Sequence, residues 1–425
     1  MIRNVAVIGA AGRIGLPTSI IIADTVLHVT GIDINQDMVN QLNGIHKRTG
    51  TIPYKEEGFE YPLVDAFKNI NFTTKFDDLK YDDVIFIIIG TPVDSDGNAN
   101  LQPLLDFCKN KLVAAMKQNK VSPLIILRST VAPGTTICIR DLLEAETGLT
   151  EGKDFFLAFC PERVAQGKAL IEMKSLPQII GTFSDKSYTE AHIFFNKIGV
   201  FNVLPRLTPT EAELSKLITN MYRYVNFAFS NEMYMLGQQY GADIHSVIAT
   251  ANKDYPRMNM PMPGPNSGGP CLSKDGKLLV EQFPFGELVN NAFLINEGMP
   301  QYIFNQAKKL KKIKTAMILG MTFKKDNDDS RLSLSYKLKK ILKKNNIKII
   351  EADGYIHVGP IYSPHDYVGG DIDAIFVMTP HQHLVDDFRY RLISELRYDC
   401  LIVDSWKALY PEMKKTIYER CEIHV

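Results

Sequence analysis

Short apolar segments rich in branched residues alternate along this chain with stretches whose apolar residues recur at helical spacing. In the first half these segments occupy residues 5–8, 27–34, 84–89, 124–127, 155–159 and 178–181. Apolar runs of this length between helical patterns are typical of buried strands in a parallel sheet. The first half therefore predicts a mainly parallel, doubly wound domain.

A long helical pattern follows from Pro209 to Gly241. Its apolar residues include Leu214, Leu217 and Ile218, and the helical spacing continues to Met221 and Val225. A helix of this length is able to join two lobes and to offer a surface for dimerisation.

A second series of strand and helix patterns begins at Lys314, with strands expected at 315–320, 347–351, 374–378 and 401–404. The basic run that starts at Lys337 has apolar residues on one face, so it predicts a solvated amphipathic helix rather than a membrane or nucleic-acid site. The predicted fold class is α/β, with two Rossmann-like doubly wound domains joined by a long central helix. The expected domains are 1–207, 208–300 and 301–425.

Composition agrees with an enzyme of several domains. The chain has 425 residues, of which 45% are hydrophobic and 23% charged, and its formal net charge is +0, which gives no bias toward nucleic acid. Residues 1–11 lack the features of a signal peptide, and the strongest apolar run, 84–89, is too short to cross a bilayer. We therefore expect a cytoplasmic protein that does not insert into a membrane. Its six cysteines show no CxxC pairing, which argues against disulfides and a metal site.

The first strand enters a turn built on Gly9, Gly12 and Gly15, and the second apolar run closes at Asp33. In a dinucleotide-binding unit such glycines let the backbone approach a pyrophosphate, and the acid accepts hydrogen bonds from the ribose of NAD. The alternative is a close packing turn between strand and helix that holds no ligand.

Other strand ends carry polar residues that a ligand site would use, because ligands bind beyond the carboxyl ends of strands in open αβ sheets. Thr91 follows the strand at 84–89, Ser129 and Thr130 follow 124–127, and Glu162 follows 155–159. Glu162 is a candidate for handling water or a proton. Thr91 and Ser129 could instead cap helices, and Glu162 could pair with Arg163.

Lys216 and Asn220 are four residues apart on the long helix and share one face. A cation and an amide donor at one point are suited to stabilise an oxyanion. The alternative is a solvated pair on an exposed face.

The segment GPNSGGPCLSKD, residues 264–275, places Cys271 on a glycine-rich turn close to Lys274 and Asp275. A thiol reacts as its thiolate, so an electropositive turn favours a nucleophilic cysteine. An ordinary glycine loop with a buried thiol is the alternative.

The order of these motifs resembles that of the UDP-glucose/GDP-mannose dehydrogenase family over nearly the whole chain. The motifs are the nucleotide-binding turn, GTP at 90–92, STVAPGT at 129–135, PE at 161–162, AE at 212–213 with Lys216 and Asn220, GGPCLSKD, and GMTFKKDNDDSRLS from Gly320.

The resemblance implies two successive hydride transfers from C6 of a nucleotide sugar to NAD, which convert an alcohol to a carboxylate for surface polysaccharide precursors. It implies that Cys271 forms a thiohemiacetal and then a thioester. The other implied catalytic residues are Lys216 and Asn220 at the oxyanions, and Thr130, Glu162 and Asp275 at water. The implied NAD-binding residues are Gly9, Gly12, Arg13, Ile14, Asp33, Thr91, Thr130 and Arg331. The implied substrate-binding residues are Glu162, Arg163, Lys216, Asn220, Arg257, Gly264, Gly268 and Lys324, with Arg257 reaching the substrate of the other subunit of a homodimer built on the central helix.

Several positions depart from the family pattern. Ala10 stands at the first glycine of the usual GxGxxG turn, and Pro270 and Ser273 replace residues of the usual cysteine motifs GGHCIP and GGSCFPKD. Gln166 stands where UDP-glucose enzymes often have glutamate, and PERV followed by a glycine is similar to the branch that acts on UDP-N-acetylhexosamines. The resemblance therefore favours UDP-N-acetylmannosamine or UDP-N-acetylglucosamine, with UDP-glucose as the alternative.

Two other classes of protein share parts of this pattern. A two-electron hydroxyacid dehydrogenase has the long helix and a lysine-asparagine pair but does not need Cys271. A catalytically silent protein would keep only the binding of a nucleotide sugar.

Overall fold

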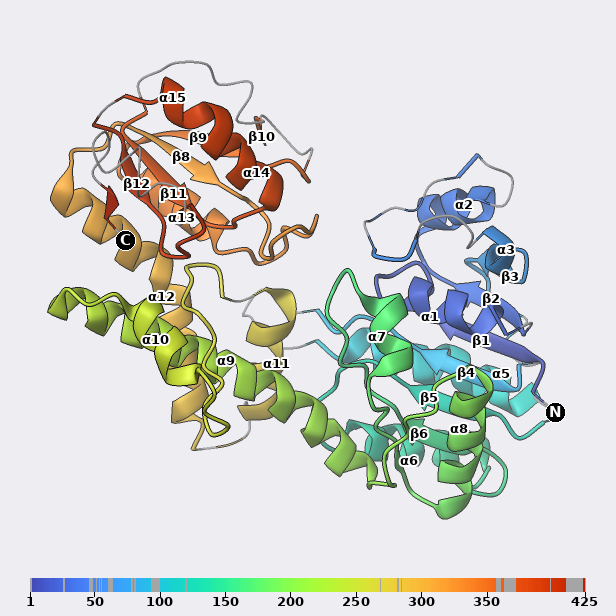
Figure 1. Ribbon diagram of the computed structural model, residues 1–425. Helices are drawn as coiled ribbons and strands as arrows, with labels where there is room; N and C mark the ends of the chain where they lie inside the picture. Colours follow the sequence, from blue (N-terminus) through green and yellow to red (C-terminus); the bar gives the residue numbers. More distant parts are fainter. Residues whose placement is uncertain are drawn as a thin grey trace. The chain divides into compact units, whose positions relative to one another are not determined.

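The computed structural model describes most of the chain. The described residues are 2–25, 27–45, 49–50, 52, 54, 56–59, 64–77, 79, 82–92, 100–118, 121–267, 269–280, 283, 285–356, 361–362, 372–397, 399–409 and 423–424. They form two compact units, the first made of residues 1–219 and 277–281 and the second of 220–276 and 282–425. The ribbon in Figure 1 is coloured along the sequence, from the first unit in blue and green to the end of the second in red.

The first unit is built on one sheet with the strand order β3-β2-β1-β4-β5-β6-β7. Its strands are β1 (Asn4–Ile8), β2 (His28–Ile32), β3 (Ile70–Thr73), β4 (Val84–Ile87), β5 (Leu124–Leu127), β6 (Phe156–Phe159) and β7 (Gly181–Thr182). All neighbouring pairs are parallel except β6 with β7. The order reverses between β1 and β4, as in a doubly wound dinucleotide-binding fold.

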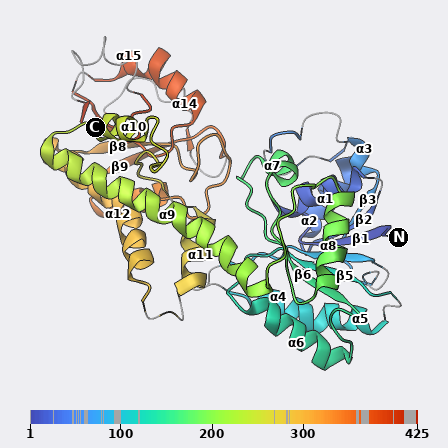
Figure 2. The ribbon, with the colours of Figure 1, turned by 60° about the horizontal axis from the view of Figure 1, so that its bottom comes forward.

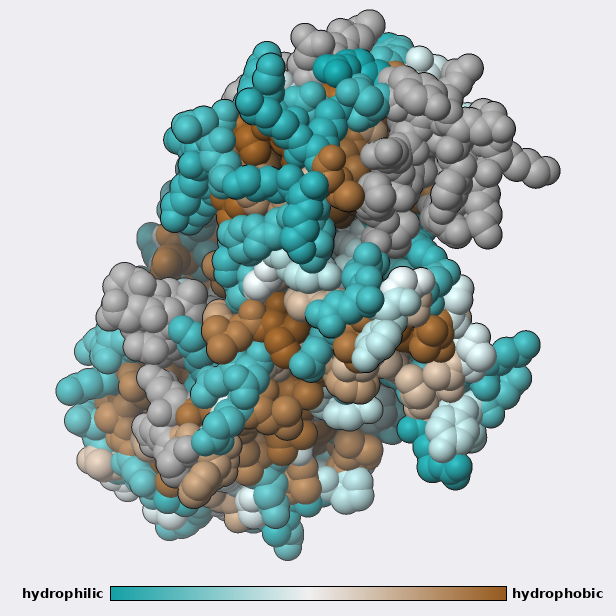
Figure 3. Space-filling model, turned by 90° about the vertical axis from the view of Figure 1, so that its left-hand side faces the viewer, coloured by the Kyte–Doolittle hydropathy of each residue, from teal (hydrophilic) through white to brown (hydrophobic). Residues whose placement is uncertain are grey.

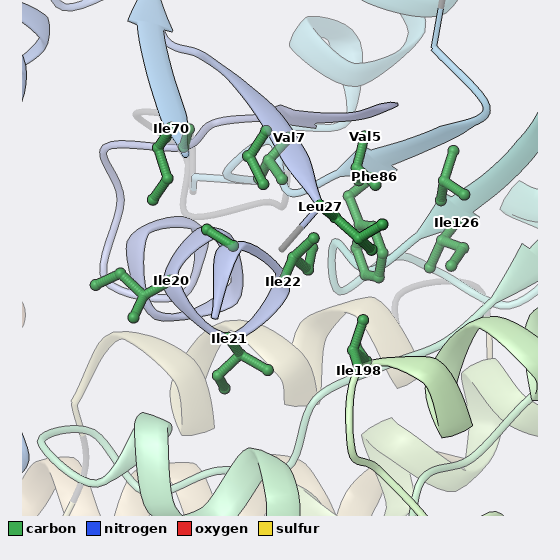
Figure 4. Close-up of a cluster of buried hydrophobic side chains, with 14 of the residues drawn as sticks. Val5, Val7, Ile20, Ile21, Ile22, Leu27, Ile70, Phe86, Ile126 and Ile198 are labelled. Atoms are coloured by element: carbon green, nitrogen blue, oxygen red, sulfur yellow. The ribbon is translucent and has the colours of Figure 1, made fainter. Parts of the chain in front are cut away.

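Helices cover both faces of this sheet. They are α1 (Gly15–Ala23), α2 (Gln36–Gly44), α3 (Val64–Phe67), α4 (Gln102–Phe107), a π-helical turn (Cys108–Leu112), α5 (Val113–Gln118), α6 (Thr135–Thr147), α7 (Ala169–Ser175) and α8 (Asp185–Lys197). Alternate residues of each strand point to opposite faces, so Val5 and Val7 pack with α1 and α8, whereas Ala6 and Ile8 pack with α4, α5 and α6. Figure 4 shows the first of these two cores, with Val5, Val7 and Phe86 above the α1 residues Ile20 to Ile22.

The expected strand at 178–181 differs from the observed structure. Gln178 makes an isolated parallel bridge with Val203, and β7 contains only Gly181 and Thr182, which run antiparallel to β6. A Cβ atom on Gly181 would lie 2.6 Å from the Cβ of Ala212, so the start of the long helix packs directly on this edge of the sheet.

The long helix is α9 (Pro209–Tyr240), as its apolar spacing predicted, and it continues from the first unit into the second. Figure 2 shows it in green along its whole length. The buried carboxylate of Glu213 accepts hydrogen bonds from the backbone N–H of Gly134 (2.6 Å) and of Thr136 (2.8 Å). This anion at the N-terminus of α6 fixes the first turns of α9 to the first unit.

The second unit contains a second sheet, with the strand order β10-β9-β8-β11-β12-β13, and all of its neighbouring strands are parallel. The strands are β8 (Thr315–Leu319), β9 (Lys348–Ala352), β10 (Ile361–Tyr362), β11 (Ala374–Val377), β12 (Leu401–Val403) and β13 (Ile423–His424). Its helical elements are α10 (Ile244–Asn252), α11 (Pro270–Val280), which crosses the division, α12 (Glu287–Leu310), α13 (Ser335–Lys344), α14 (Gln382–Asp387), a π-helical turn (Phe388–Leu392) and α15 (Ile393–Glu395). The expected fold class, two Rossmann-like domains joined by a long central helix, is confirmed.

The basic helix α13 has the predicted amphipathic form. Leu338 and Leu342 are fully buried in the core of the second unit, and Lys337 and Lys339 form ion pairs with Glu297 (3.0 Å) and Glu351 (2.7 Å). Among the described residues, no helix is long and apolar enough to cross a membrane. The division into the three expected domains remains a prediction.

The aromatic side chains in the first of these two cores, the one that contains Val5 and Val7, provide a test of the fold. Phe86 is 1% exposed and its ring lies 5.5 Å from that of Phe194. Replacing Phe86 by Ala leaves a cavity in the centre of the sheet, so we expect the free energy of unfolding to fall by about 3–5 kcal/mol. Urea denaturation followed by circular dichroism measures the change. Phe201→Ala is the control, because Phe201 is 77% exposed and should change stability by less than about 0.5 kcal/mol. An equal effect of both substitutions would contradict the assigned core.

Candidate active site

The turn after β1 has the geometry of a nucleotide-binding loop. The backbone N–H of Gly9 donates to Ile32 O (2.8 Å), and that of Gly12 donates to Gly9 O (3.1 Å). Gly9 has φ +84°, and a Cβ there would lie 2.4 Å from Ile88 O. A Cβ on Gly15 would lie 2.0 Å from Gly9 O, so the start of α1 approaches the turn in a way that only glycine permits.

Asp33 follows β2 and holds this turn in place. One carboxylate oxygen, Oδ2, accepts the backbone N–H of Ala11 (3.0 Å), and Oδ1 accepts that of Asn35 (3.0 Å). A carboxylate has about four acceptor positions, so the side chain retains capacity for ribose hydroxyls.

A cavity of about 520 Å³ lies at the carboxyl ends of β1, β2 and β4. Its walls include Gly9, Gly12, Asp33, Ile34, Phe76, Gly90, Asp106, Phe107, Asn110 and Lys111. A glycine cradle, an acid at the end of β2 and a partly apolar cavity at the point where the strand order reverses fit NAD. Three of the predicted cofactor residues, Gly9, Gly12 and Asp33, line this cavity.

Several wall residues were not predicted from the sequence. Asn110 and Lys111 belong to the π-helical turn after α4, and Lys111 Nζ lies 5.5 Å from the centre of the Phe76 ring. Local π-helical geometry is common at functional sites, but no residue pattern in the sequence predicted this turn.

The other predicted cofactor residues lie around the same loops. The guanidinium of Arg13 stands 5.0 Å from the centre of the Tyr54 ring, and Tyr54 Oη donates to Gly12 O (2.9 Å). Ile14 is the N-cap residue of α1. The hydroxyl of Thr91 donates to Thr130 O (2.8 Å) and thereby connects the ends of β4 and β5.

Glu162 and Lys216 form a buried ion pair within the first unit. Lys216 Nζ donates to Glu162 Oε1 (3.2 Å). The side chain of Lys216 is 7% exposed and that of Glu162 is 16% exposed. Glu162 Oε2 accepts the backbone N–H of Val164 (2.8 Å), while Arg163 points elsewhere and donates to Pro177 O (2.5 Å). The two alternative interpretations of these residues, a solvated Lys216 and a Glu162–Arg163 pair, are therefore wrong.

A second buried cation, Arg128, lies at the end of β5. Its Nη1 donates to Cys160 O (3.2 Å) and to Gln178 Oε1 (3.1 Å), so it braces the backbone just before Glu162. Burial raises the pKa of Glu162, but the charges of Lys216 and Arg128 and the hydrogen bond from Val164 outweigh it and leave the pKa below the ordinary 4.5. Glu162 is thus ionised at neutral pH.

Asn220 lies one turn beyond Lys216 on α9, and both Asn220 and its partner Asp275 belong to the second unit. Asn220 Nδ2 donates to Asp275 Oδ2 (2.6 Å), and Asn220 and Asp275 are both buried. Asp275 Oδ1 also lies 3.7 Å from Lys274 Nζ. The alternative of a solvated Asn220 is wrong as well.

The cysteine segment differs from the expected turn, because it begins a helix. Pro270 is the first residue of α11 and Cys271 the second, so Asp275 follows Cys271 by one helical turn. Proline is favoured at the first position of a helix, where its fixed φ suits the helix and no N–H is needed. The glycines before it favoured a turn in the sequence, but helix α11 starts directly after them.

Two other described thiols, those of Cys108 and Cys160, are poor nucleophiles. Burial raises the pKa of Cys108 to about 12 and raises that of Cys160 as well. Both stay protonated at neutral pH, and a protonated thiol is unreactive. Among the described residues, no group of three or more His, Cys, Asp or Glu side chains could hold a metal ion.

The predicted substrate residues lie at several places. Arg257 is exposed, and its Nε donates to Tyr255 Oη (2.9 Å). A Cβ on Gly264 would lie 2.2 Å from the Trp406 ring, which gives this glycine a packing role. Gly268 lies outside the described residues. Lys324 is half-buried in the loop after β8, and Arg331 forms a two-pronged pair with Asp329 (2.7 and 2.9 Å).

The buried pair at Glu162 leads to a prediction about stability and pH. Glu162→Gln leaves Lys216 and Arg128 without their anion, so we expect a loss of about 3–5 kcal/mol in the free energy of unfolding at neutral pH. The folded pKa lies below 4.5, so this contribution is complete above pH 4.5 and is lost as pH falls through the lower folded value. Urea denaturation at pH 7 and below pH 4 measures the free energy of unfolding of both proteins, and the difference between Glu162→Gln and wild type should be smaller at the lower pH. Glu57→Gln is the control, because Glu57 is exposed. A stability difference between Glu162→Gln and wild type that does not depend on pH would contradict the buried ion pair.

The sequence and the fold both match known proteins. The NAD binding domain of the UDP-glucose/GDP-mannose dehydrogenase family matches residues 3–198, and the central domain of that family matches residues 210–296. A UDP-N-acetyl-D-mannosamine dehydrogenase of Pyrococcus horikoshii is 32% identical over 389 residues, which are 89% of either chain. Another from Campylobacter jejuni is 33% identical over 344 residues, 78% of this chain and 81% of that one.

A solved structure extends the likeness to three dimensions. The UDP-D-ManNAc dehydrogenase of Pyrococcus horikoshii superposes with a TM-score of 0.84 at 31% identity, and the match covers 94% of both chains. This agreement and the ordered motifs lead to one conclusion: the chain belongs to the UDP-glucose/GDP-mannose dehydrogenase family.

Proposed function

We propose that this protein is an NAD-dependent 6-dehydrogenase that oxidises the C6 alcohol of a UDP-N-acetylhexosamine to the carboxylate. The observation that carries the proposal is the pair of buried polar contacts on successive turns of α9, Lys216 with Glu162 and Asn220 with Asp275. Burial of polar and charged side chains costs free energy of folding, so such pairs often mark functional sites. A cation beside an amide donor suits the oxyanions of this reaction.

UDP-N-acetylmannosamine is the first candidate substrate. Relatives from Pyrococcus and Campylobacter carry the name UDP-N-acetyl-D-mannosamine dehydrogenase, and Gln166 within PERVAQG agrees with an acetylated sugar. UDP-N-acetylglucosamine and UDP-glucose are the alternatives. The product would serve as a precursor of surface polysaccharide.

NAD, when bound, accepts the hydride that leaves C6 in each of two oxidations. The residues proposed to hold it are Gly9, Gly12, Arg13, Ile14, Asp33, Thr91 and Thr130, with Arg331 for the pyrophosphate. Asp33 would also exclude a 2′-phosphate by charge repulsion, which favours NAD over NADP.

Lys216 and Asn220 are proposed to stabilise negative charge on the substrate oxygen. Lys216 has three N–H donors, one of which Glu162 occupies, and Asn220 directs one amide hydrogen to Asp275, so both keep donors for the substrate. Their carboxylate partners fix the two groups before substrate arrives, which is the condition for electrostatic preorganisation. Loss of such a donor typically costs about 2.7–4 kcal/mol in the barrier.

Glu162, Thr130 and Asp275 are proposed to position water and to accept its proton. The low pKa of Glu162 keeps the carboxylate ionised, so it is suited to accept a hydrogen bond or a proton rather than to donate one. Asp275 would receive support for the same role from its contact with Asn220.

Cys271 is proposed to supply the covalent step. Its thiolate adds to C6 of the aldehyde, an S–C bond forms, and the carbonyl electron pair becomes an oxyanion that is protonated to the thiohemiacetal. The hydroxyl of the thiohemiacetal loses its proton as the second hydride departs from C6, which leaves a thioester. Water then adds to this carbon, the S–C bond breaks, and the thiolate returns as the carboxylate is released. The position of Cys271 in the first turn of α11 supports this role, because the N-terminus of a helix favours a thiolate.

Lys324, Arg163, Gly264 and Gly268 are proposed to contact the nucleotide sugar. A cytoplasmic location is proposed because the described cysteines 108, 138 and 160 are free thiols, as is usual in a reducing compartment.

A homodimer through α9 is proposed as the working form. One side of this helix leaves large apolar residues exposed at helical spacing: Ile218, Tyr222, Phe229, Leu236 and Tyr240. Figure 3 shows that apolar residues, in brown, also lie exposed among polar ones on one face of the molecule. A contiguous apolar stripe usually marks a protein interface. Arg257, exposed in the same unit as most of the stripe, would serve the substrate of the partner subunit.

The reaction is tested by counting electrons. We expect two NADH per UDP-sugar consumed, because each sugar gives up two hydrides, and we expect UDP-N-acetylmannosamine to have the highest kcat/KM in a panel with UDP-N-acetylglucosamine, UDP-glucose and GDP-mannose. Cys271→Ser should reduce acid formation by at least about 1000-fold, since the hydroxyl is a far weaker nucleophile. Absorbance of NADH and chromatography of the products measure both quantities.

Cys138→Ser is the matched control, because Cys138 is exposed and has no role in the scheme. One NADH per sugar would indicate a simple two-electron dehydrogenase, and no NADH would indicate a silent binding protein. Full turnover to the acid in Cys271→Ser would refute the thioester.

The dimer is tested by charging the apolar stripe. Phe229→Glu buries a carboxylate in the proposed interface, so we expect the dimer dissociation constant to rise by at least about 100-fold. Light scattering after size-exclusion chromatography measures the mass at several concentrations. Phe201→Glu is the control outside α9. A wild-type monomer, or an unchanged dimer in Phe229→Glu, would contradict the proposal.

A further inference from the structure

The loop after β8 is held by one buried histidine that none of the roles above uses. His381 lies just beyond β11, and its side chain is 0% exposed. β8 and β11 are neighbours at the point where the strand order of the second sheet reverses. In open αβ sheets this edge is where ligands bind, and the loop carries Lys324 and Lys325.

The first nitrogen of the imidazole holds the far end of the loop. The backbone N–H of Asp326 donates to His381 Nδ1 (2.8 Å). Because a backbone N–H can only donate, Nδ1 must be the unprotonated nitrogen and the neutral ring carries its proton on Nε2. Asp326 has the left-handed φ of +55°, and its Oδ1 accepts the backbone N–H of Gln382 (2.8 Å). The residues beside β11 thus stabilise a conformation that costs energy for a residue with a side chain.

The second nitrogen holds the near end of the loop. His381 Nε2 lies 2.8 Å from Thr322 Oγ1 and 3.3 Å from Asp353 Oδ2. Asp353 also accepts the backbone N–H of Met321 (2.7 Å), so it fixes the point where the chain leaves β8. Thr322 Oγ1 accepts from the imidazole and donates to Lys324 O (3.2 Å). Hydrogen bonds from one ring therefore reach both sides of Lys324.

We propose that His381 is a positioning residue for substrate binding: its neutral imidazole fixes the loop on both sides of Lys324 and so presents this lysine to the anionic nucleotide sugar. The inference rests on the proposed function, in which Lys324 binds that substrate. An ordered loop lowers the entropy lost on binding, so the effect belongs to affinity and not to the chemical step.

Two substitutions at His381 distinguish the contributions of the hydrogen bonds at Nδ1 and Nε2. His381→Asn keeps an acceptor near Nδ1 for the Asp326 N–H and loses the donor to Thr322, whereas His381→Gln keeps a donor near Nε2 and loses the acceptor. We expect either variant to raise the KM for the UDP-sugar and the Kd for UDP by about tenfold, as for one lost hydrogen bond, with kcat and the KM for NAD within about twofold of wild type. Steady-state kinetics and calorimetry with UDP measure these values.

Amide hydrogen exchange adds a readout that needs no ligand. The Asp326 amide should exchange faster than in wild type in His381→Gln and at nearly the wild-type rate in His381→Asn, because only the first loses its acceptor. His383→Asn is the control: His383 is exposed, stacks on the His381 ring at 5.6 Å, and should change none of these quantities by more than about twofold.

The outcomes distinguish the inference from the function on which it rests. A wild-type protein without affinity for UDP overturns both. Wild-type affinity for UDP that is unchanged in both His381 variants, or a fall in kcat with an unchanged KM, overturns only the role of His381. If the His381 variants do not fold, Thr322→Val tests the same hydrogen bonds with little change in side-chain volume. The KM for the UDP-sugar should rise about threefold in Thr322→Val and should be close to the wild-type value in Thr322→Ser. An unchanged KM in Thr322→Val would overturn the proposal.

Discussion

The ion pair between Glu162 and Lys216 is the constraint on which the arrangement of the candidate site depends. A carboxylate and an ammonium in a buried position are stable only together, so the end of β6 and the second turn of α9 cannot separate without leaving an unpaired charge. Arg128 adds a second positive charge and holds the backbone before Glu162. Asn220 leaves the same helix one turn after Lys216 and on the same face.

The two units hold their functional groups by different physical means. In the first unit the anchors are charged: Glu162 with Lys216, and Glu213 with the N-terminus of α6. In the second unit the anchors are largely neutral. The amide of buried Asn266 donates to Thr322 O (2.9 Å) and accepts from the backbone N–H of Leu334 (2.8 Å), and the imidazole of His381 has its tautomer set by a backbone donor. A buried charged anchor holds its partner because an unpaired charge is costly, whereas neutral hydrogen bonds hold the loop after β8 in one conformation.

The strands and the long helix were predictable from the sequence because burial imposes a period on apolar residues. β1, β5 and β8 fall where short apolar runs predicted them, and α9 ends within one residue of its predicted end. The partners of polar side chains were not predictable, since Glu162 and Lys216 are 54 residues apart and Asn266 and Leu334 are 68 apart. Arg163, the nearest charged neighbour in sequence, was the wrong partner for Glu162, because tertiary packing places the end of β6 against Lys216 of α9.

The cysteine segment shows how a residue that departs from a family pattern can suit the local backbone. Glycines before Pro270 suggested a continuous turn, yet α11 begins at this proline. A helix can start at proline without loss of a hydrogen bond, because the first N–H groups of a helix have no partner within it. Pro270 therefore suits the entry to α11, in which Cys271 and Asp275 lie one turn apart. Asp275 in turn is fixed by Asn220, which ties the cysteine helix to the same α9 that carries Lys216.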